Sequence, residues 1–190
     1  MAVYTTVGAA EAGDLFAQLG LGPLTDLQGI RSGIENTNYY ATTPQGQWVL
    51  TLFERLAPQQ LPYYLELMQH LAQRGIPVPE PQGDASGTLV HTLAGKPAAV
   101  VTRLPGSHRS APGVSHVAQV GAMLARMHLA AADYPRTLAH GRGLSWWQAT
   151  VPTVLPHLPA SQAELMRDEL AFLAAALASP AGQSLPAGPI

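Results

Sequence analysis

Several residue types are scarce or missing in this sequence of 190 residues. It has no cysteine, which excludes disulfide bonds, thiolate metal sites and a cysteine nucleophile, and which agrees with a cytoplasmic location. Charged residues make up only 12% and the net charge is −2, so no basic face for nucleic acid is expected. No apolar run is long enough to span a membrane, and no signal peptide is visible. We therefore expect neither nucleic-acid nor membrane partners.

Residues that build common catalytic sites are scarce as well. The seven histidines contain no pair with zinc-site spacing, and no Gly-x-Ser-x-Gly motif supports hydrolase chemistry. The only asparagines are Asn36 and Asn38, and no lysine precedes Lys96. The hydrophobic fraction, in contrast, is 47%, which is enough to form the core of a domain of ordinary size. The sequence therefore describes a well-packed chain in which few residues are available for chemistry.

Two β-rich runs near the N-terminus are the most informative stretch. Residues 37–43 and 48–53 flank a Pro/Gly-containing turn at 44–47, which predicts a β-hairpin. Just upstream, Gly29 and Gly33 bracket a small polar loop. Such a loop can bring backbone N–H groups close to a phosphate. Taken alone, the loop is more often an ordinary connection between two strands, because Gly-rich turns are common.

Apolar spacing and turn residues predict the other elements. Three strands, one helix and two further strands indicate an antiparallel five-stranded sheet with a helix packed on one face. A small, polar, Pro-containing stretch then precedes a part of the chain that is helical throughout. Ser115 is expected to cap the first of these helices, and Ser161 with Glu164 to form a capping box on the last. The predicted helices are 9–19, 58–74, 115–131, 146–155 and 161–178, and the remaining strands are 24–30, 88–93 and 98–104.

Six sequence segments, spread in order along nearly the whole chain, carry a family resemblance. Together they resemble the protein-kinase-like fold of the aminoglycoside phosphotransferase and choline kinase superfamily, and within it bacterial homoserine kinase. The implied fold is α+β, with residues 1–104 as a nucleotide-binding lobe, 105–114 as a hinge or linker, and 115–190 as a partial helical lobe. The segments are 32–40, 48–54, 61–68, 75–81, 95–106 and 119–128.

The resemblance implies ATP-dependent phosphorylation of the hydroxyl of L-homoserine, an early step of threonine synthesis. ATP is then the cofactor, and Mg²⁺ is expected for the complete enzyme. The loop over the nucleotide phosphates maps onto residues 32–38, and the hinge whose backbone reads the adenine maps onto residues 101–104. The cofactor-binding residues implied in this way are Ser32, Gly33, Glu35, Asn36, Asn38, Thr51, Glu66, Val101, Thr102, Arg103 and Leu104.

Thr51 marks a departure from the protein-kinase pattern. In protein kinases the third strand holds a lysine that binds the phosphates and pairs with a helix glutamate, here matched by Glu66. Thr51 falls at the lysine position, and a threonine hydroxyl supplies no charge. Arg31, Arg55 or Arg103 can contribute the charge instead, and the sequence does not choose among them. A solvated charge on the polar side of a helix is an equally good interpretation of Glu66.

The catalytic loop of the fold is the second departure. Phosphoryl transfer needs an aspartate base, an asparagine a few residues on and a further aspartate for Mg²⁺. No His-x-Asp-x-x-x-x-Asn pattern is present, Asp133 has no asparagine near it, and Asp168 and Glu169 are expected to face water. The expectation is that the chain ends just short of the catalytic loop, without catalytic residues or Mg²⁺ ligands, and is inactive alone.

Two alternatives stay open at this point. The chain is a non-catalytic module that binds a nucleotide or a partner protein, in which case an apolar face around Leu165, Phe172 and Leu173 is available for association. Alternatively, it belongs to a kinase for another small alcohol, such as an aminoglycoside or choline. Acceptor residues in this fold come largely from the second lobe, so homoserine rests on the resemblance alone. The oligomeric state does not follow from the sequence.

Overall fold

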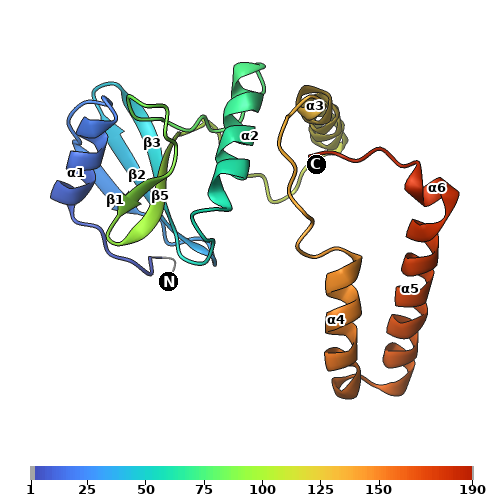
Figure 1. Cartoon of the computed structure of the whole chain (residues 1–190). Helices are drawn as coiled ribbons and strands as arrows, with labels where there is room; N and C mark the ends of the chain where they lie inside the picture. Colours follow the sequence, from blue (N-terminus) through green and yellow to red (C-terminus); the bar gives the residue numbers. More distant parts are fainter. Residues whose placement is uncertain (1–2, 190) are drawn as a thin grey trace. The chain divides into compact units, whose positions relative to one another are not determined.

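The computed structural model describes residues 3–189 (Figure 1). It contains two compact units, one reaching to Arg136 and including Pro189, the other running from Thr137 to Gly188. The first unit holds α1 (Ala9–Gln18), β1 (Asp26–Gly29), β2 (Asn36–Thr43), β3 (Gly46–Phe53), α2 (Leu61–Gln73), β4 (His91–Leu93), β5 (Lys96–Thr102) and α3 (Val114–Ala131). The second holds α4 (Leu144–Val154), a short 3₁₀ turn (Leu155–His157), α5 (Ala160–Ala178) and α6 (Pro180–Gln183).

The five strands form one antiparallel sheet in the order β1-β2-β3-β5-β4, which confirms the predicted α+β fold class. The β2–β3 hairpin closes over a two-residue loop, because Thr43 lies opposite Gly46 in the register. A Cβ at Gly46 would meet the Trp48 indole at 3.4 Å, which is an ordinary van der Waals contact. The turn at the other end of the sheet needs left-handed backbone, and Ala94 and Gly95 supply it with φ values of 49° and 71°.

Side chains alternate between the two faces of the sheet, and only one face is fully covered. On that face α1 packs Phe16 against Leu50 and Val100, and all three are completely buried. On the opposite face α2 packs Leu61 and Leu65 against part of the sheet around Ala99. On the remainder of this second face, Asn38, Val49 and Thr51 are half-buried and Tyr40 is exposed, whereas Val101 of β5 is buried. The candidate site lies on this uncovered part.

The start of α2 differs from the prediction. The helix was expected from Pro58, but it begins at Leu61, and Pro62 is the proline in its first turn. The reason is a tight turn before the helix, in which the Gln60 N–H bonds to the Ala57 carbonyl. Pro62 is tolerated because a first-turn residue has no helical partner for its N–H. The predicted end is confirmed, with Gly75 left-handed at φ 73°.

Two predicted helix caps are wrong. The third helix begins at Val114, with extended Gly113 as its N-cap, so Ser115 lies inside the first turn. His116 Nδ1 accepts a hydrogen bond from the Gly113 N–H, which closes this end of the helix. The fifth helix has Pro159 as its N-cap without any side-chain cap, so the expected capping box does not form. Both errors have the same cause. The extended backbone at Gly113 and at Pro159 sets the first residue of each helix, and both positions precede the serine that was expected to cap it.

The compact units divide after Arg136, whereas residues 105–114 were expected to separate two lobes. α3 belongs to the first unit because Ala131 packs with Leu71 and Ile76 from the end of α2. The structure does not test the functional division into residues 1–104, 105–114 and 115–190, which therefore remains a prediction.

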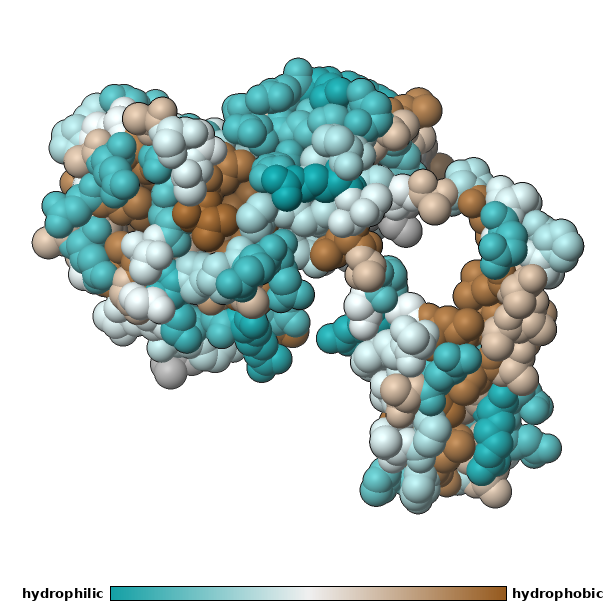
Figure 2. Space-filling model, viewed as in Figure 1, coloured by the Kyte–Doolittle hydropathy of each residue, from teal (hydrophilic) through white to brown (hydrophobic). Residues whose placement is uncertain are grey.

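Several helices expose apolar side chains. On α3, Val117 is 61% exposed and Val120 is 68% exposed. On α5, Leu165 is 66% and Phe172 64% exposed, and Leu173 is half-buried. Hydrophobic residues also colour much of the visible surface of the α4–α5 pair (Figure 2). Within residues 3–189, no helix combines the length and the apolarity that crossing a membrane would need.

Candidate functional site

Asn38 and Thr51 lie directly opposite each other on the hairpin, on the uncovered face of the sheet. The Thr51 hydroxyl donates a hydrogen bond of 2.8 Å to Oδ1 of Asn38. Both side chains are half-buried. The third strand therefore presents a neutral polar pair at the position where a phosphate-binding lysine was considered. This pair can offer the Asn38 amide to a ligand oxygen, but it supplies no charge.

An apolar row lies next to this polar pair. Tyr40, Val49 and Val101 are in register across β2, β3 and β5, one step along the hairpin from Asn38 and Thr51. The guanidinium of Arg103 lies 4.0 Å from the centre of the Tyr40 ring, within the range of a cation–π contact. The site therefore combines an apolar row with a cation that lies over the Tyr40 ring. Of the three arginines left open by the sequence, Arg103 is the one that the structure places on this face.

The loop between β1 and β2 carries Ser32, Gly33 and Glu35, and all three are exposed. Gly33 has a φ of 122°, which residues with a Cβ rarely adopt. Within the described chain, the backbone N–H groups of residues 31–35 donate to no protein acceptor. From behind, the Tyr4 hydroxyl holds the loop by donating to the Ile34 carbonyl at 3.1 Å. A run of free N–H groups around a glycine is the geometry that receives an anion.

The four predicted hinge residues lie at the end of β5 and directly after it. The Thr102 N–H bonds to the Glu80 carbonyl and the Arg103 N–H to the Gln47 carbonyl, each at 3.0 Å. The Thr102 hydroxyl in turn accepts from the Glu80 N–H at 2.8 Å. Leu104 is 42% exposed, and in the described part of the chain its N–H has no partner. The backbone group available to a ligand is therefore that of Leu104.

Behind the loop, Thr37 starts a buried polar network at the beginning of β2. Its hydroxyl accepts from the Tyr4 and Thr5 N–H groups and donates to Glu54 at 2.7 Å. Glu54 also accepts from the Thr5 hydroxyl at 2.7 Å and pairs with Lys96 at 3.1 Å. This network ties the N-terminal segment to three strands. It therefore fixes the base from which the exposed loop extends.

Glu54 gives the network a pH dependence. Burial would raise the pKa of its carboxyl, but the bonds from Thr37, Thr5 and Lys96 outweigh burial and hold the pKa below 4.5. A carboxyl with a lowered folded-state pKa stabilises the fold above its unfolded-state pKa, and this contribution disappears as the pH falls through the lowered value. We expect the free energy of unfolding in urea to fall below about pH 4.5, with a smaller fall in Glu54→Gln. An equal fall in both proteins would contradict this role.

Glu66 does not join the third strand. Its carboxylate forms a two-point ion pair with Arg136, in which Arg136 Nη2 donates to Oε1 at 2.7 Å and Nε contacts Oε2. No ion pair or hydrogen bond links Glu66 to β3 in the part of the chain that the structure describes. The sequence reasoning missed Arg136, because it lies in a loop 70 residues away with no motif around it.

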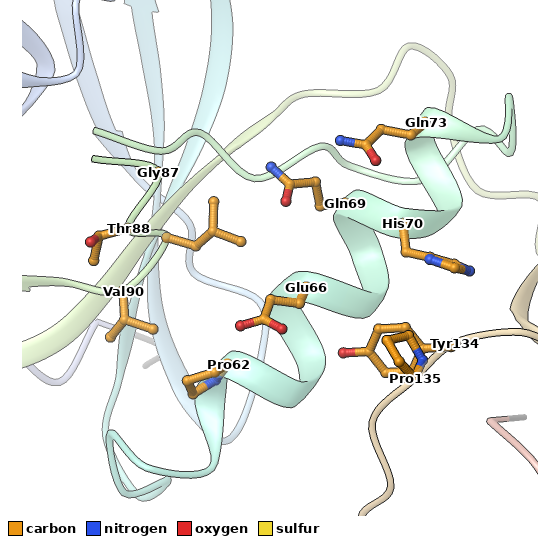
Figure 3. A pocket seen from close by; sticks show the side chains of 11 residues that line it. Pro62, Glu66, Gln69, His70, Gln73, Gly87, Thr88, Val90, Tyr134 and Pro135 are labelled. Atoms are coloured by element: carbon orange, nitrogen blue, oxygen red, sulfur yellow. The ribbon is translucent and has the colours of Figure 1, made fainter. Parts of the chain in front are cut away.

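A cavity of about 530 Å³ lies beside Glu66. Gln69 and Gln73 project from α2 toward Gly87 and Thr88, and Tyr134 lies at the other side of Glu66 (Figure 3). None of the sequence-predicted site residues except Glu66 lines this cavity. The predicted residues are instead gathered on the uncovered sheet face, the β1–β2 loop and the end of β5, so the cavity is a separate feature.

The described residues do not fit a Mg²⁺ site. No group of three or more His, Cys, Asp or Glu side chains within residues 3–189 is placed to hold a metal ion. Asp133 contacts Arg74 and His70, and Asp84 accepts bonds from Ser86 and Thr88 in its own turn. The oxygen ligands that Mg²⁺ requires are therefore not assembled by these residues.

Comparison with known proteins identifies the family. A family model described as the phosphotransferase enzyme family matches residues 26–187. The chain belongs to this family. The matched residues include the β1–β2 loop, the apolar row and the end of β5, so the candidate site lies within the shared region.

Curated relatives of this family member are close in sequence. The homoserine kinase of Polaromonas naphthalenivorans is 54% identical over 190 residues, which are 100% of this chain and 60% of that protein. The homoserine kinase of Paraburkholderia xenovorans is 49% identical over 189 residues, covering 100% of this chain and 57% of that protein. The chain thus spans between 57% and 60% of the length of these relatives.

Solved structures share the fold at low sequence identity. A spectinomycin phosphotransferase in complex with ADP and spectinomycin has a TM-score of 0.57 and 15% identity, over 92% of this chain and 55% of that chain. An amicoumacin kinase in complex with AMP-PNP and Ca²⁺ has a TM-score of 0.58 and 18% identity, over 85% of this chain and 49% of that chain. At this level of identity the likeness concerns the fold alone, and it confirms the kinase-like arrangement of the sheet and α2.

Proposed function

We propose that this chain is the nucleotide-binding part of an ATP-dependent homoserine kinase. Homoserine as the phosphoryl acceptor is supported by sequence identities of 54% and 49% to two homoserine kinases along the whole chain. Nucleotide binding is supported by the open sheet face, with its apolar row and its neutral polar pair, and by the free N–H groups of the adjoining loop. We also propose a cytoplasmic location, which the absence of cysteine supports.

The apolar row is the proposed surface for the adenine. Tyr40 is exposed, Val49 is half-buried and Val101 lies buried at the end of the row, and an aromatic base gains from contact with the exposed part of such a row. The Leu104 N–H at the end of the row is the donor proposed to read the base edge. Val101, Thr102 and Arg103 then act by holding β5 in register rather than by donating their own N–H groups, because those of Thr102 and Arg103 are already bonded.

The phosphates are proposed to lie under the β1–β2 loop. The N–H groups around Ser32 and Gly33 would donate hydrogen bonds to the phosphate oxygens, and Asn38 would add an amide donor beneath the loop. Glu35 is exposed in the same loop, and its carboxylate adds a negative charge near the proposed phosphate position. Arg103 is the cation on this face and can supply part of the charge that Thr51 lacks.

Phosphoryl transfer needs groups that this chain does not contain. The sequence holds no asparagine after Asn38, and no catalytic aspartate–asparagine pair is present. What the described residues can do is bind and orient the nucleotide and exclude water from the base. We therefore expect ATP binding by the chain itself, without homoserine-dependent ADP formation.

A chimera tests whether this chain can serve as the nucleotide-binding part of a homoserine kinase. The 190-residue chain, followed by the remaining part of the Polaromonas homoserine kinase, is assayed for ADP formation with Mg²⁺ and ATP. Homoserine should support turnover at least ~10-fold above choline, kanamycin and spectinomycin, because a site that bonds its substrate's polar groups rejects analogues that lack them. A folded chimera that prefers another alcohol, or that shows no turnover, would overturn the proposal. The relative's own full-length enzyme is the positive control.

The alternative of a non-catalytic binding module is supported by one observation. Leu165 and Phe172 on α5 are mostly exposed, as that hypothesis expected. Exposed apolar residues of this size invite association. Analytical ultracentrifugation of the chain distinguishes the two, since a monodisperse monomer that binds ATP would count against a partner-binding module.

A further inference from the structure

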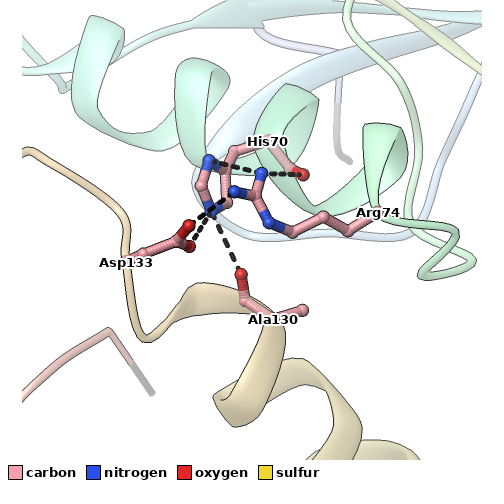
Figure 4. Close-up of polar contacts among 4 residues, drawn as sticks. All are labelled: His70, Arg74, Ala130 and Asp133. Atoms are coloured by element: carbon pink, nitrogen blue, oxygen red, sulfur yellow. Dashed lines mark hydrogen bonds and ion pairs between the residues drawn. The ribbon is translucent and has the colours of Figure 1, made fainter.

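A short segment after α3 holds α2 from the side. This clamp segment, residues 133–136, contacts the helix at three places. Near the helix end, Asp133 accepts a bond from Arg74 at 2.8 Å and lies 3.2 Å from His70 Nε2 (Figure 4). Further along, the Tyr134 hydroxyl donates to the Tyr63 carbonyl at 2.8 Å. The third contact is the ion pair of Arg136 with Glu66.

His70 is the most enclosed member of these contacts, with 14% of its side chain exposed. Its Nδ1 lies 3.0 Å from Arg74 Nη1. Because arginine can only donate, Nδ1 must accept, and the ring hydrogen is on Nε2. Nε2 then donates toward the Ala130 carbonyl at 3.1 Å and toward Asp133 (Figure 4). One histidine thus links the end of α3 to α2 with a defined tautomer.

The contacted positions share one side of α2. Tyr63, Glu66, His70 and Arg74 recur at three- and four-residue spacing, so they follow one another along the helix surface. Leu61 and Leu65 lie on another side, which packs on the sheet at Ala99. α2 is therefore held by its apolar packing on the sheet, by the packing of Leu71 against Ala131 of α3, and by the clamp segment.

The third strand contributes no charge to this arrangement. In protein kinases a lysine there pairs with the helix glutamate and links the helix to the phosphate site. Here Thr51 is bonded to Asn38, and Glu66 is bonded to Arg136. We propose that Arg136 has taken over the role of partner to Glu66, so that the clamp segment, and not the phosphate-binding strand, positions α2. The part of this proposal that concerns ATP affinity rests on the proposed function. The part that concerns the position of α2 does not.

A charge swap tests the partnership. Glu66→Arg and Arg136→Glu are each expected to speed hydrogen exchange of the α2 amides by about two- to fivefold, the effect of losing a well-formed surface ion pair. The double variant should restore slow exchange, because it rebuilds the pair in reverse. Asp14→Arg on α1, a charge change at an exposed residue, is the matched control and should leave α2 unchanged. A double variant no better than the single variants would overturn the proposal.

A second readout separates positioning from phosphate binding. Calorimetric titration with MgATP should give dissociation constants within about twofold of the parent for Glu66→Gln and Arg136→Gln, since neither side chain reaches the third strand. If Glu66→Gln bound MgATP ten times more weakly, Glu66 would contribute to the phosphate site. That result would overturn the proposal that Arg136 is its partner. If the parent itself binds no ATP, the proposed function fails. Hydrogen exchange in the charge-swap variants still decides whether the clamp segment holds α2.

Discussion

Replacing Val49 by glutamate is expected to weaken ATP binding by about 10- to 100-fold. Val49 is the middle member of the apolar row, between Tyr40 and Val101. A carboxylate there would have to lose water against the adenine, and it would add a negative charge beside the phosphates. Each tenfold loss corresponds to about 1.4 kcal/mol, which lies within the cost of burying an unpaired polar group. Calorimetric titration with ATP measures the effect.

Gln47→Glu is the control for this substitution. Gln47 lies on the same strand and the same face, two residues earlier, and is exposed. The same carboxylate placed there should change the affinity less than about twofold, because it stays in water. An equal loss in both variants would show that net charge, and not the apolar row, governs binding. Unchanged ATP affinity in Val49→Glu would show that the nucleotide does not bind on this face.

Thr37→Val is expected to lower the free energy of unfolding by about 1–3 kcal/mol. Valine keeps the shape of this fully buried side chain but removes a hydroxyl that has three hydrogen-bond partners. The Tyr4 and Thr5 N–H groups lose their acceptor, and Glu54 loses a donor. Urea unfolding monitored by circular dichroism measures the change.

Thr42→Val is the matched control on the same strand. Thr42 is half-buried, and its hydroxyl makes no hydrogen bond within the described residues. This change should therefore stay within about 0.5 kcal/mol of the parent. Because the network anchors the loop, Thr37→Val should also raise hydrogen exchange at Ile30, whose N–H is bonded to the Asn38 carbonyl at the start of the loop. A stability equal to that of the control would show that the network does not hold the N-terminal segment.

The sheet could be predicted from the sequence because its signals are local. Alternating apolar residues, the Pro44 turn and Gly75 after α2 each follow from backbone chemistry within a few positions. The helix starts were less predictable, since Gly113 and Pro159 compete with nearby serines for the same role. In both cases main-chain geometry decided the start before side-chain capping could.

The candidate site was predictable only in part, because the residues that come together in it depend on how the strands pair. Once the hairpin is in place, alternation puts Asn38 and Thr51 opposite each other and Tyr40 on the same face. The contact of Arg103 with Tyr40 and the pairing of Arg136 with Glu66 join residues 63 and 70 positions apart. No local pattern encodes such distances, so the resemblance suggested Glu66 but not its partner.

The exposed apolar residues of the helices were anticipated on α5 but not on α3. The apolar spacing of α3 predicted a packed helix, and Ala131 and Met127 do pack against α2. Val117 and Val120 lie on the same predicted stripe and yet remain exposed. Periodicity reports that a face is apolar, and it carries no information on what covers that face.

The most direct test of nucleotide binding at this face is a titration of the isotope-labelled chain with ATP, followed by amide NMR. We predict that the largest shifts occur at Ser32 and Gly33 in the loop and at Leu104 after β5, with smaller changes along the apolar row. Amides beside the cavity, such as those of Gln69 and Gln73, should stay within the background. Shifts confined to the cavity, or no shifts at millimolar ATP, would contradict the assignment of the nucleotide to the open sheet face.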